Sequence, residues 1–244
     1  MRLLTAAVLV TLGSASAFAA PPAVFNWTGF YVGGHVGGAA EQGRLSNFPN
    51  GSGFGIPFPT VIPTPDVLLR SDGVIGGGQV GFNWQLPSSW VAGVEGDISH
   101  YGHTGTGSFS IAAFPFGGPA GTVEFQTDLF VTARARLGYA AGNLLFYGTG
   151  GAAWSKEKLN TSGTTCGFFL CGTFASSDSQ WVSGWAAGGG ADYAFAPNWF
   201  VRLEYLRLDF GKKNFAVDPS FGPTLPLFSR VDLVRFALNY KFGN

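Results

Sequence analysis

The stretch VEFQTDLFVTARARLGYA, residues 123–140, decides the fold class. The odd-numbered positions of this stretch, which would lie on one face of a strand and which we call one parity, are mostly apolar. They are Phe125, Thr127, Leu129, Val131, Ala133, Ala135, Leu137 and Tyr139. The other parity is mostly polar and consists of Glu124, Gln126, Asp128, Phe130, Thr132, Arg134, Arg136 and Gly138. Because successive side chains of a strand point to opposite faces, this alternation predicts a β-strand between two unlike environments.

Segments of this kind are joined by short and long links in turn. The short links are Leu86-Pro87-Ser88-Ser89, Ala141-Gly142-Asn143 and Ala196-Pro197-Asn198, and the long ones are residues 41–71, 103–122, 157–178 and 212–228. Such alternation is typical of an outer-membrane barrel with periplasmic turns and extracellular loops. We therefore predict an all-β fold, an eight-stranded antiparallel up-and-down transmembrane β-barrel, whose loops carry the outward contacts.

The N-terminus has the features of a secretory signal peptide. Arg2 precedes an apolar run that begins at Leu3, and small residues then end in Ala17-Phe18-Ala19, an Ala-x-Ala cleavage pattern. We expect a signal peptide over residues 1–19, which is removed, and a barrel domain over residues 20–244.

Composition narrows the class further. After the signal peptide, no run approaches the ~20 apolar residues that a transmembrane helix needs. Mean hydropathy is nevertheless +0.21, 11% of residues are charged and 16% are aromatic. A barrel reconciles these values, because every second residue of a strand can face lipid. The formal net charge is zero, which argues against a nucleic-acid partner, because binding of nucleic acid needs a clustered basic surface. We also expect no cofactor.

The volume of the apolar side chains indicates which face contacts lipid. The interior of an eight-stranded barrel is just wide enough for side chains, and these bulky residues would overfill it. Apolar faces should therefore contact lipid, with aromatic girdles at the interfaces. The girdle expected at the short-turn end comprises Phe30, Phe82, Trp84, Trp90, Tyr139, Phe146, Tyr193, Phe195, Trp199, Tyr240 and Phe242. A sparser girdle at the loop end would comprise Phe125, Trp154 and Trp181.

The opposite faces would supply a polar lumen. The candidate lumen charges are Glu95, Asp97, Glu124, Asp128, Arg134, Arg136, Asp192, Arg202, Glu204, Arg235 and Lys241. Their signs nearly balance, which favours a plug of ion pairs, since buried charges need partners. The alternative is a small diffusion pore in which these charges filter solutes.

One predicted strand is irregular. In residues 199–210, Leu206 and Leu208 share the parity of Arg202 and Glu204. This irregularity predicts a bulge, or an early exit from the membrane, near Tyr205.

Several motifs extend from the first strand to the last. They are Asn26-Trp27-Thr28-Gly29-Phe30-Tyr31-Val32-Gly33-Gly34, Gly81-Phe82-Asn83-Trp84-Gln85, Gly93-Val94-Glu95-Gly96-Asp97, Arg134-Ala135-Arg136-Leu137-Gly138-Tyr139, Gly184-Trp185, Asp192-Tyr193-Ala194, Glu204-Tyr205 and residues 234–242. The chain resembles the porin-family surface barrels of alphaproteobacteria, which are related to the opacity-type and OmpA-like eight-stranded barrels.

This resemblance implies an integral protein of the cell outer membrane and does not imply an enzyme. We expect a structural or surface role and no catalytic activity. The resemblance also implies contact with outer-membrane lipid and insertion by the barrel-assembly machinery through the last strand, with Tyr240 and Phe242 as the insertion signal. Family members usually end on the terminal aromatic residue, whereas Gly243 and Asn244 follow Phe242 here.

Cys166 and Cys171 are the only cysteines. Because export passes through an oxidising compartment, we predict a disulfide between them, worth roughly 2 kcal/mol by chain entropy. Metal binding by this pair is less favoured, since no histidine is near in sequence.

Two further groups of residues bear on function. His100 and His103 flank the outer rim of the third strand, so a loop-borne receptor for haem or another extracellular ligand is a further alternative. Ser99 and His100 are adjacent in a strand and point to opposite faces, so they should not act together as a catalytic pair.

Overall fold

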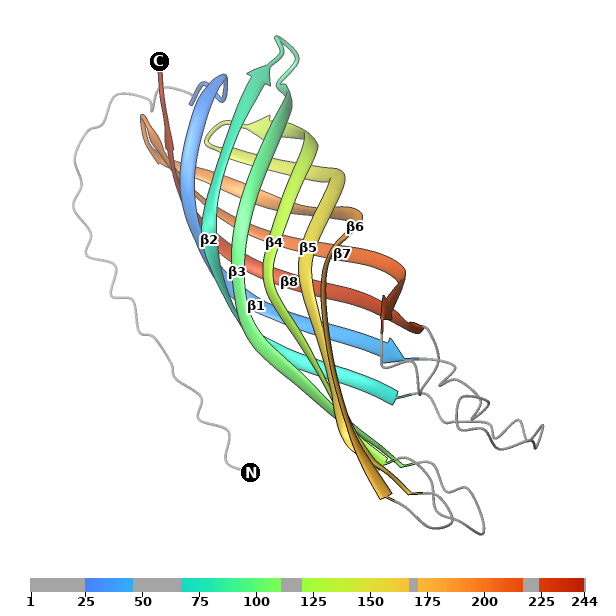
Figure 1. Ribbon diagram of the computed structural model, residues 1–244. Coiled ribbons are helices and arrows are strands. Elements are labelled where there is room, and N and C mark those ends of the chain that lie inside the picture. The colour runs from blue at the N-terminus through green and yellow to red at the C-terminus, as the bar shows by residue number, and fades with distance from the viewer. Residues whose placement is uncertain (1–24, 46–66, 111–119, 167–170, 217–223, 244) are drawn as a thin grey trace, which may run out of the picture.

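The computed structural model describes residues 25–45, 67–110, 120–166, 171–216 and 224–243. The strands are β1 (Gly29–Leu45), β2 (Val67–Gln85), β3 (Trp90–Ser110), β4 (Ala120–Ala141), β5 (Leu144–Cys166), β6 (Cys171–Ala196), β7 (Trp199–Ala216) and β8 (Thr224–Lys241). Each strand pairs antiparallel with the next one in the chain, and β8 pairs with β1, which closes the ring (Figure 1). The predicted fold class is confirmed. The predicted signal peptide, residues 1–19, lies outside the described residues.

Three short turns lie together at one end of the barrel, at the top of Figure 1. They fall at residues 86–89, 142–143 and 197–198, as predicted. Ser89 and Gly142 adopt positive φ angles of 65° and 63°, the left-handed conformation that tight turns use. The Ser89 amide donates to the carbonyl of Leu86 at 3.1 Å, and its carbonyl accepts from the amide of Ala140 at 2.8 Å. These bonds hold a non-glycine residue in this conformation.

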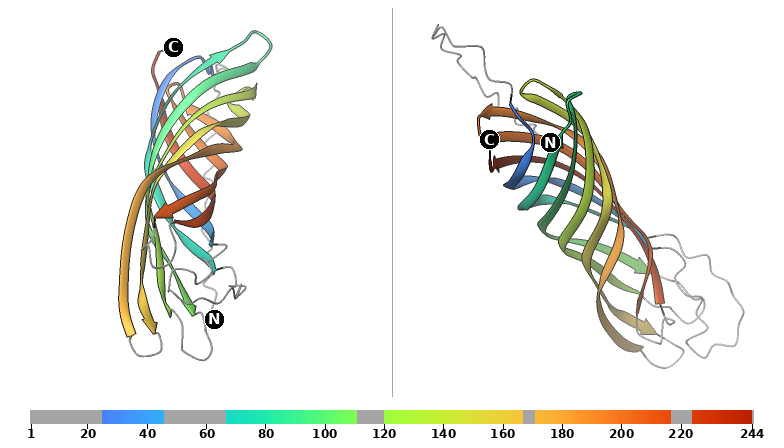
Figure 2. Two further views of the ribbon diagram at one scale, coloured as in Figure 1. Left: turned by 45° about the vertical axis from the view of Figure 1, so that its right-hand side comes forward. Right: turned by 90° about the horizontal axis from the view of Figure 1, so that it is seen from above.

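At the other end, the strands continue farther than predicted. β1 and β2 include residues 41–45 and 67–71, β3 runs to Ser110, β5 to Cys166 and β7 to Ala216, all of which were assigned in part to loops. The predicted loop boundaries were therefore too wide at all four places. Pairing continues because neighbouring strands satisfy each other's backbone N–H and C=O groups whatever the side chains. β5 and β6 project farthest at this end (Figure 2).

An uncharged belt covers the outer wall near the short turns. Its exposed aromatic residues include Phe30, Trp84, Trp90, Tyr139, Phe146, Tyr193, Phe195, Trp199 and Phe242. Towards the loop end, outward charges appear at Arg44, Asp72, Lys156, Arg207 and Asp232. Because hydrocarbon tolerates few charges, we expect the segments between the short turns and these charges to span the membrane, and the parts beyond them to lie outside the hydrocarbon.

The interior is layered, and its two apolar clusters were not predicted from the sequence. One apolar cluster near the short turns contains Phe25, Trp27, Tyr31, Val91, Ala140, Leu145, Tyr147, Ala194 and Phe200. A larger apolar cluster towards the loop end includes Ile75, Tyr101, Val123, Phe125, Phe130, Leu159, Leu206, Leu208, Phe210, Leu227 and Val231. Charged side chains lie between the two clusters.

This layering corrects the prediction for β7. Leu206 and Leu208 are fully buried, and the β7–β8 register runs without a break from Trp199 to Asp209. The register shift lies later, between Asp209 and Gly211, so the bulge predicted near Tyr205 is wrong. The alternative, an exit from the membrane near Tyr205, stays a prediction, and the outward charges of Arg207 and Asp232 agree with it. One parity of β7 supplies both charged and apolar side chains because it crosses both layers.

A register shift also corrects the prediction for β4. Pairing with β5 slips between Thr127 and Leu129, which reverses the parity of the residues before the slip. Phe125 is therefore buried, with 1% of its surface exposed, and does not belong to the outer girdle. Trp154 and Trp181 are exposed on the outer wall, as predicted.

Candidate functional site in the barrel interior

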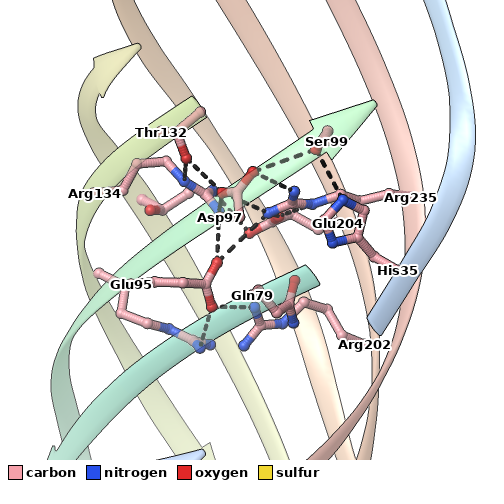
Figure 3. Close-up of polar contacts among 12 residues, drawn as sticks. His35, Gln79, Glu95, Asp97, Ser99, Thr132, Arg134, Arg202, Glu204 and Arg235 are labelled. Carbon is pink, nitrogen blue, oxygen red and sulfur yellow. Dashed lines mark hydrogen bonds and ion pairs between the residues drawn. The ribbon is translucent and has the colours of Figure 1, made fainter. Parts of the chain in front are cut away.

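Eight charged side chains form the middle layer of the interior. Figure 3 labels all of them except Arg136 and Asp192. The acids are Glu95 and Asp97 on β3, Asp192 on β6 and Glu204 on β7, and the bases are Arg134 and Arg136 on β4, Arg202 on β7 and Arg235 on β8. β3, β4 and β7 each supply two members at positions i and i+2, which share one face of a strand. The side chains are at most 2% exposed, and their charges cancel. We call this set the ionic layer.

Glu95 lies at the centre of the ionic layer. Its carboxylate accepts from Nη2 of Arg134 at 2.5 Å and from Nη1 of Arg202. Nη1 of Arg136 and Nη2 of Arg235 lie at 3.6 and 3.5 Å from the same carboxylate. The Tyr31 hydroxyl donates to Oε2 at 2.5 Å. One carboxylate therefore contacts all four guanidinium groups.

Asp97 and Glu204 form the side of the layer nearer the loop end. Asp97 accepts from Nη1 of Arg235 at 3.0 Å, from Nη2 of Arg134 at 2.9 Å and from the Thr132 hydroxyl at 2.5 Å. Glu204 contacts Nη2 of Arg235 at 2.6 Å and Nη1 of Arg134 at 3.2 Å. Both arginines thus bridge β3 to β7 across the interior.

Asp192 forms the side nearer the short turns. It accepts from Nε of Arg202 at 2.8 Å and from Nη2 of Arg136 at 2.7 Å. The guanidinium of Arg136 lies 3.8 Å from the centroid of the Tyr147 ring. The Tyr147 hydroxyl donates to Oε1 of Glu204 at 2.8 Å, so it links the two sides of the layer.

The segment before β1 covers the short-turn end of the interior. The Trp27 amide donates to Oε1 of Gln85 at 2.8 Å, and its ring lies 5.7 Å from that of Phe200. Nζ of Lys241 lies 5.3 Å from the Phe25 ring. Trp27 is fully buried, so this segment packs against the interior of the barrel.

Ser99 contacts a histidine, but a different one from its neighbour in sequence. Its hydroxyl lies 2.8 Å from Nε2 of His35 on β1, whereas His100 is exposed. A nucleophile and base also need a third group that orients the base, and Nδ1 of His35 has no hydrogen-bond partner among the described residues. Both side chains are buried in the packed interior, so this geometry does not amount to a hydrolytic site.

Three predicted lumen residues lie outside the ionic layer. Glu124 is exposed on the outer wall, and Oδ1 of Asp128 accepts from the outward Gln126 at 2.7 Å, because the β4 register shift reverses the parity there. Lys241 is buried, but its ammonium donates to the carbonyls of Thr28 and Gly243 at 3.3 and 2.8 Å. The other eight predicted residues converge.

The remaining predicted residues lie at the two ends of the barrel. Cys166 is the register partner of Cys171, and Cys171 is disulfide-bonded, which fits the predicted pairing. The Tyr240 and Phe242 rings lie 5.0 Å apart, near the seam between β8 and β1. The side chain of His103 lies outside the described residues.

The uncharged members of the site were not predicted from the sequence. Tyr31 and Tyr147 were not assigned to the lumen, although their parity opposite Phe30 and Phe146 on the outer wall would have identified them. Among the described residues, no group of three or more histidine, cysteine or acidic side chains is arranged to hold a metal ion. The ionic layer is suited to cross-linking the strands by charge, since each acid is matched by arginines.

Comparisons with known proteins agree on the compartment. Residues 5–242 match the outer membrane protein beta-barrel domain family. The 31 kDa outer-membrane immunogenic protein of Brucella melitensis is 38% identical over 235 residues, covering 92% of this chain and 87% of that protein. The 22 kDa outer membrane protein of Rhizobium leguminosarum is 26% identical over 195 residues, covering 79% of this chain and 69% of that protein. The structure of the outer membrane protein OprG from Pseudomonas aeruginosa aligns with a TM-score of 0.50 at 12% identity, covering 89% of this chain and 99% of that one.

Proposed function

Because the chain belongs to the outer membrane protein beta-barrel domain family and lies in the cell outer membrane, we propose that it is a structural surface protein whose barrel interior is sealed. The outer belt contacts membrane lipid, and the loops make the outward contacts. The barrel-assembly machinery inserts the chain through β8, with Tyr240 and Phe242 as its signal.

The ionic layer is the observation that carries this proposal. Four arginines and four acids cancel in charge and are fully buried, and Glu95 alone contacts all four guanidinium groups. A permeating ion would have to separate pairs that have already lost their hydration, which costs several kcal/mol per ion. The interior of an eight-stranded barrel leaves little space beside such side chains.

The apolar clusters on both sides of the ionic layer support the same proposal. Trp27 and Phe200 pack on the short-turn side, and Phe130 and Phe210 stack at 6.1 Å on the loop side. Apolar packing offers no polar group to replace the hydration of an ion. An ion would therefore meet three barriers in series.

The experiment that tests the seal is single-channel conductance of the refolded mature protein in a planar bilayer. Heat-modifiable migration on a gel first confirms folding. We expect no reproducible conductance steps, because the interior offers no hydrated path. Steps whose ion selectivity shifts in the double variant Arg134→Gln/Arg136→Gln, but not in the outward control Arg207→Gln, would refute the seal and favour the diffusion pore.

The surface role is tested by epitope insertion. The Brucella relative carries the description immunogenic, which fits a protein with exposed loops. A tag placed within residues 46–66 should bind its antibody on intact cells. The same tag within residues 86–89, at the short-turn end, should bind only after permeabilisation. Equal labelling of the two tags on intact cells would contradict the proposed orientation.

A further inference from the structure

The apolar cluster towards the loop end contains two acidic side chains. Glu41 on β1 and Glu157 on β5 are 2% and 0% exposed. The Thr127 hydroxyl on β4 donates to Oε1 of Glu41 at 3.2 Å, and Thr127 is the cross-strand partner of Glu157. The Ser229 hydroxyl on β8 donates to the same oxygen at 3.1 Å. Side chains from opposite walls of the barrel therefore meet here.

These acids lie beyond the membrane-spanning part of the barrel. Glu157 stands between Lys156 and Lys158 in β5, and Lys156 is exposed on the outer wall. The register partners of Glu41 on β2 and β8 are Ser71 and Val231, which adjoin the outward Asp72 and Asp232. Outward charges at this level indicate that the hydrocarbon has ended.

The acids differ from those of the ionic layer because no ion pair joins either of them to a basic side chain in the part of the chain that the structure describes. Neither oxygen of Glu157 accepts a hydrogen bond of good geometry among the described residues, although the Ser229 hydroxyl is near enough to lower the pKa of this carboxyl. The hydroxyl of Ser155, two positions earlier on the same face of β5 and fully buried, also has none. Unsatisfied buried polar groups are rare, and a bound ion is one way in which such oxygens become satisfied.

Burial raises the pKa of Glu157 to about 8, and the nearby Glu41 carboxyl adds to that rise. Burial raises the pKa of Glu41 to about 7, against the opposing effect of the Ser229 and Thr127 hydroxyls.

We propose that Glu41, Glu157 and the hydroxyls of Thr127, Ser155 and Ser229 bind one oxygen-seeking inorganic cation of the Ca²⁺ class. Two oxygens on each carboxylate and one on each hydroxyl offer seven donors, and Ca²⁺ takes about 6–8 oxygen ligands. The surrounding side chains of Phe125, Leu159 and Leu227 are apolar, which strengthens attraction between a cation and the acids.

The positive charge of Lys213 would compete with a bound cation for the Glu157 carboxylate. Lys213 is the β7 partner of the inward Leu227, and its positive charge acts on Glu157. No ion pair joins the two among the described residues, so the carboxylate stays available. Removing the lysine charge should therefore favour a bound cation.

The test is titration calorimetry with CaCl₂, and separately with MgCl₂, on the chelator-treated mature protein refolded in detergent micelles. We expect saturable binding of one Ca²⁺ per chain and a rise in melting temperature. Glu157→Gln and Glu41→Gln should each lower the affinity for Ca²⁺ at least tenfold, whereas Lys213→Gln should raise it. The control Glu124→Gln removes an exposed carboxylate of the same barrel and should leave the affinity unchanged.

Heat-modifiable migration confirms that each variant is folded before it is titrated. Absence of saturable Ca²⁺ binding to the wild type would overturn the proposal. Wild-type affinity in both Glu41→Gln and Glu157→Gln would do so too, because binding would then occur at exposed carboxylates. Weaker binding in Lys213→Gln would also count against the site.

Discussion

The substitution Glu95→Gln tests the ionic layer directly. It keeps the shape of the side chain and removes one negative charge that all four buried guanidinium groups contact within 3.6 Å. The layer then holds four positive charges against three negative ones. Removing one partner of a buried ion pair costs about 3–5 kcal/mol, because the remaining charge is left uncompensated. We expect the free energy of unfolding to fall by an amount in that range.

The assay is urea unfolding of the refolded protein in micelles, followed by tryptophan fluorescence and extrapolated linearly to zero urea. The matched control is Glu124→Gln, the same change on the outer wall, which should alter stability by no more than about 0.5 kcal/mol. A double variant with Arg202→Gln restores the charge balance. Its cost should differ from the sum of the single costs by about 0.5–3 kcal/mol.

Two results would refute this reasoning. One is a loss in Glu95→Gln no larger than in Glu124→Gln, which would mean that water or rearranged side chains already compensate the arginines. The other is strict additivity in the double variant, which would mean that Glu95 and Arg202 do not interact.

Three further predictions concern other parts of the barrel. Gly81→Ala should destabilise the protein by about 1–3 kcal/mol in the urea assay, because its Cβ would lie 2.4 Å from the Tyr31 ring, whereas Gly78→Ala, whose Cβ would meet its nearest atom at 3.7 Å, should cost less. With a chelator present, wild-type stability should fall as pH rises from 5 to 8, because folding raises the pKa of Glu157 from 4.5 to about 8 and the folded chain keeps a proton that the unfolded chain releases. Glu157→Gln should make stability depend less on pH. If the urea midpoint changes with pH as steeply in this variant as in the wild type, Glu157 is not the group responsible. Cys171→Ser should cost roughly 2 kcal/mol or less, because the disulfide closes only a short loop, and full unfolding on reduction would contradict this.

Some members of the site were readable from the chain because they follow a simple rule. Inward residues of a strand recur at every second position, so Arg134 and Arg136 and the pair Glu95 and Asp97 could be assigned to one face without coordinates. Near balance of the signs also indicated ion pairing. These inferences depend only on local geometry, which the sequence carries.

Other members were not readable, because parity holds only while the register is unbroken. One inserted residue in β4 moves Phe125 into the interior and Glu124 to the outer wall. The local sequence pattern does not predict this register shift, because both sets of alternating positions there contain apolar and polar residues. Likewise, Glu41 and Glu157 were assigned to loops because polar residues beyond the membrane no longer alternate against lipid.

By itself, the sequence determined the strand number, the short turns, the lipid-facing belt and the eight charged residues of the ionic layer, because each depends on spacing along the chain. The tertiary structure alone decided which charges meet, that apolar layers lie on both sides of them, and that Ser99 faces His35. Such contacts join strands that are distant in sequence. They depend on how the ring closes and on the stagger of each pair, and these follow from packing of the whole barrel.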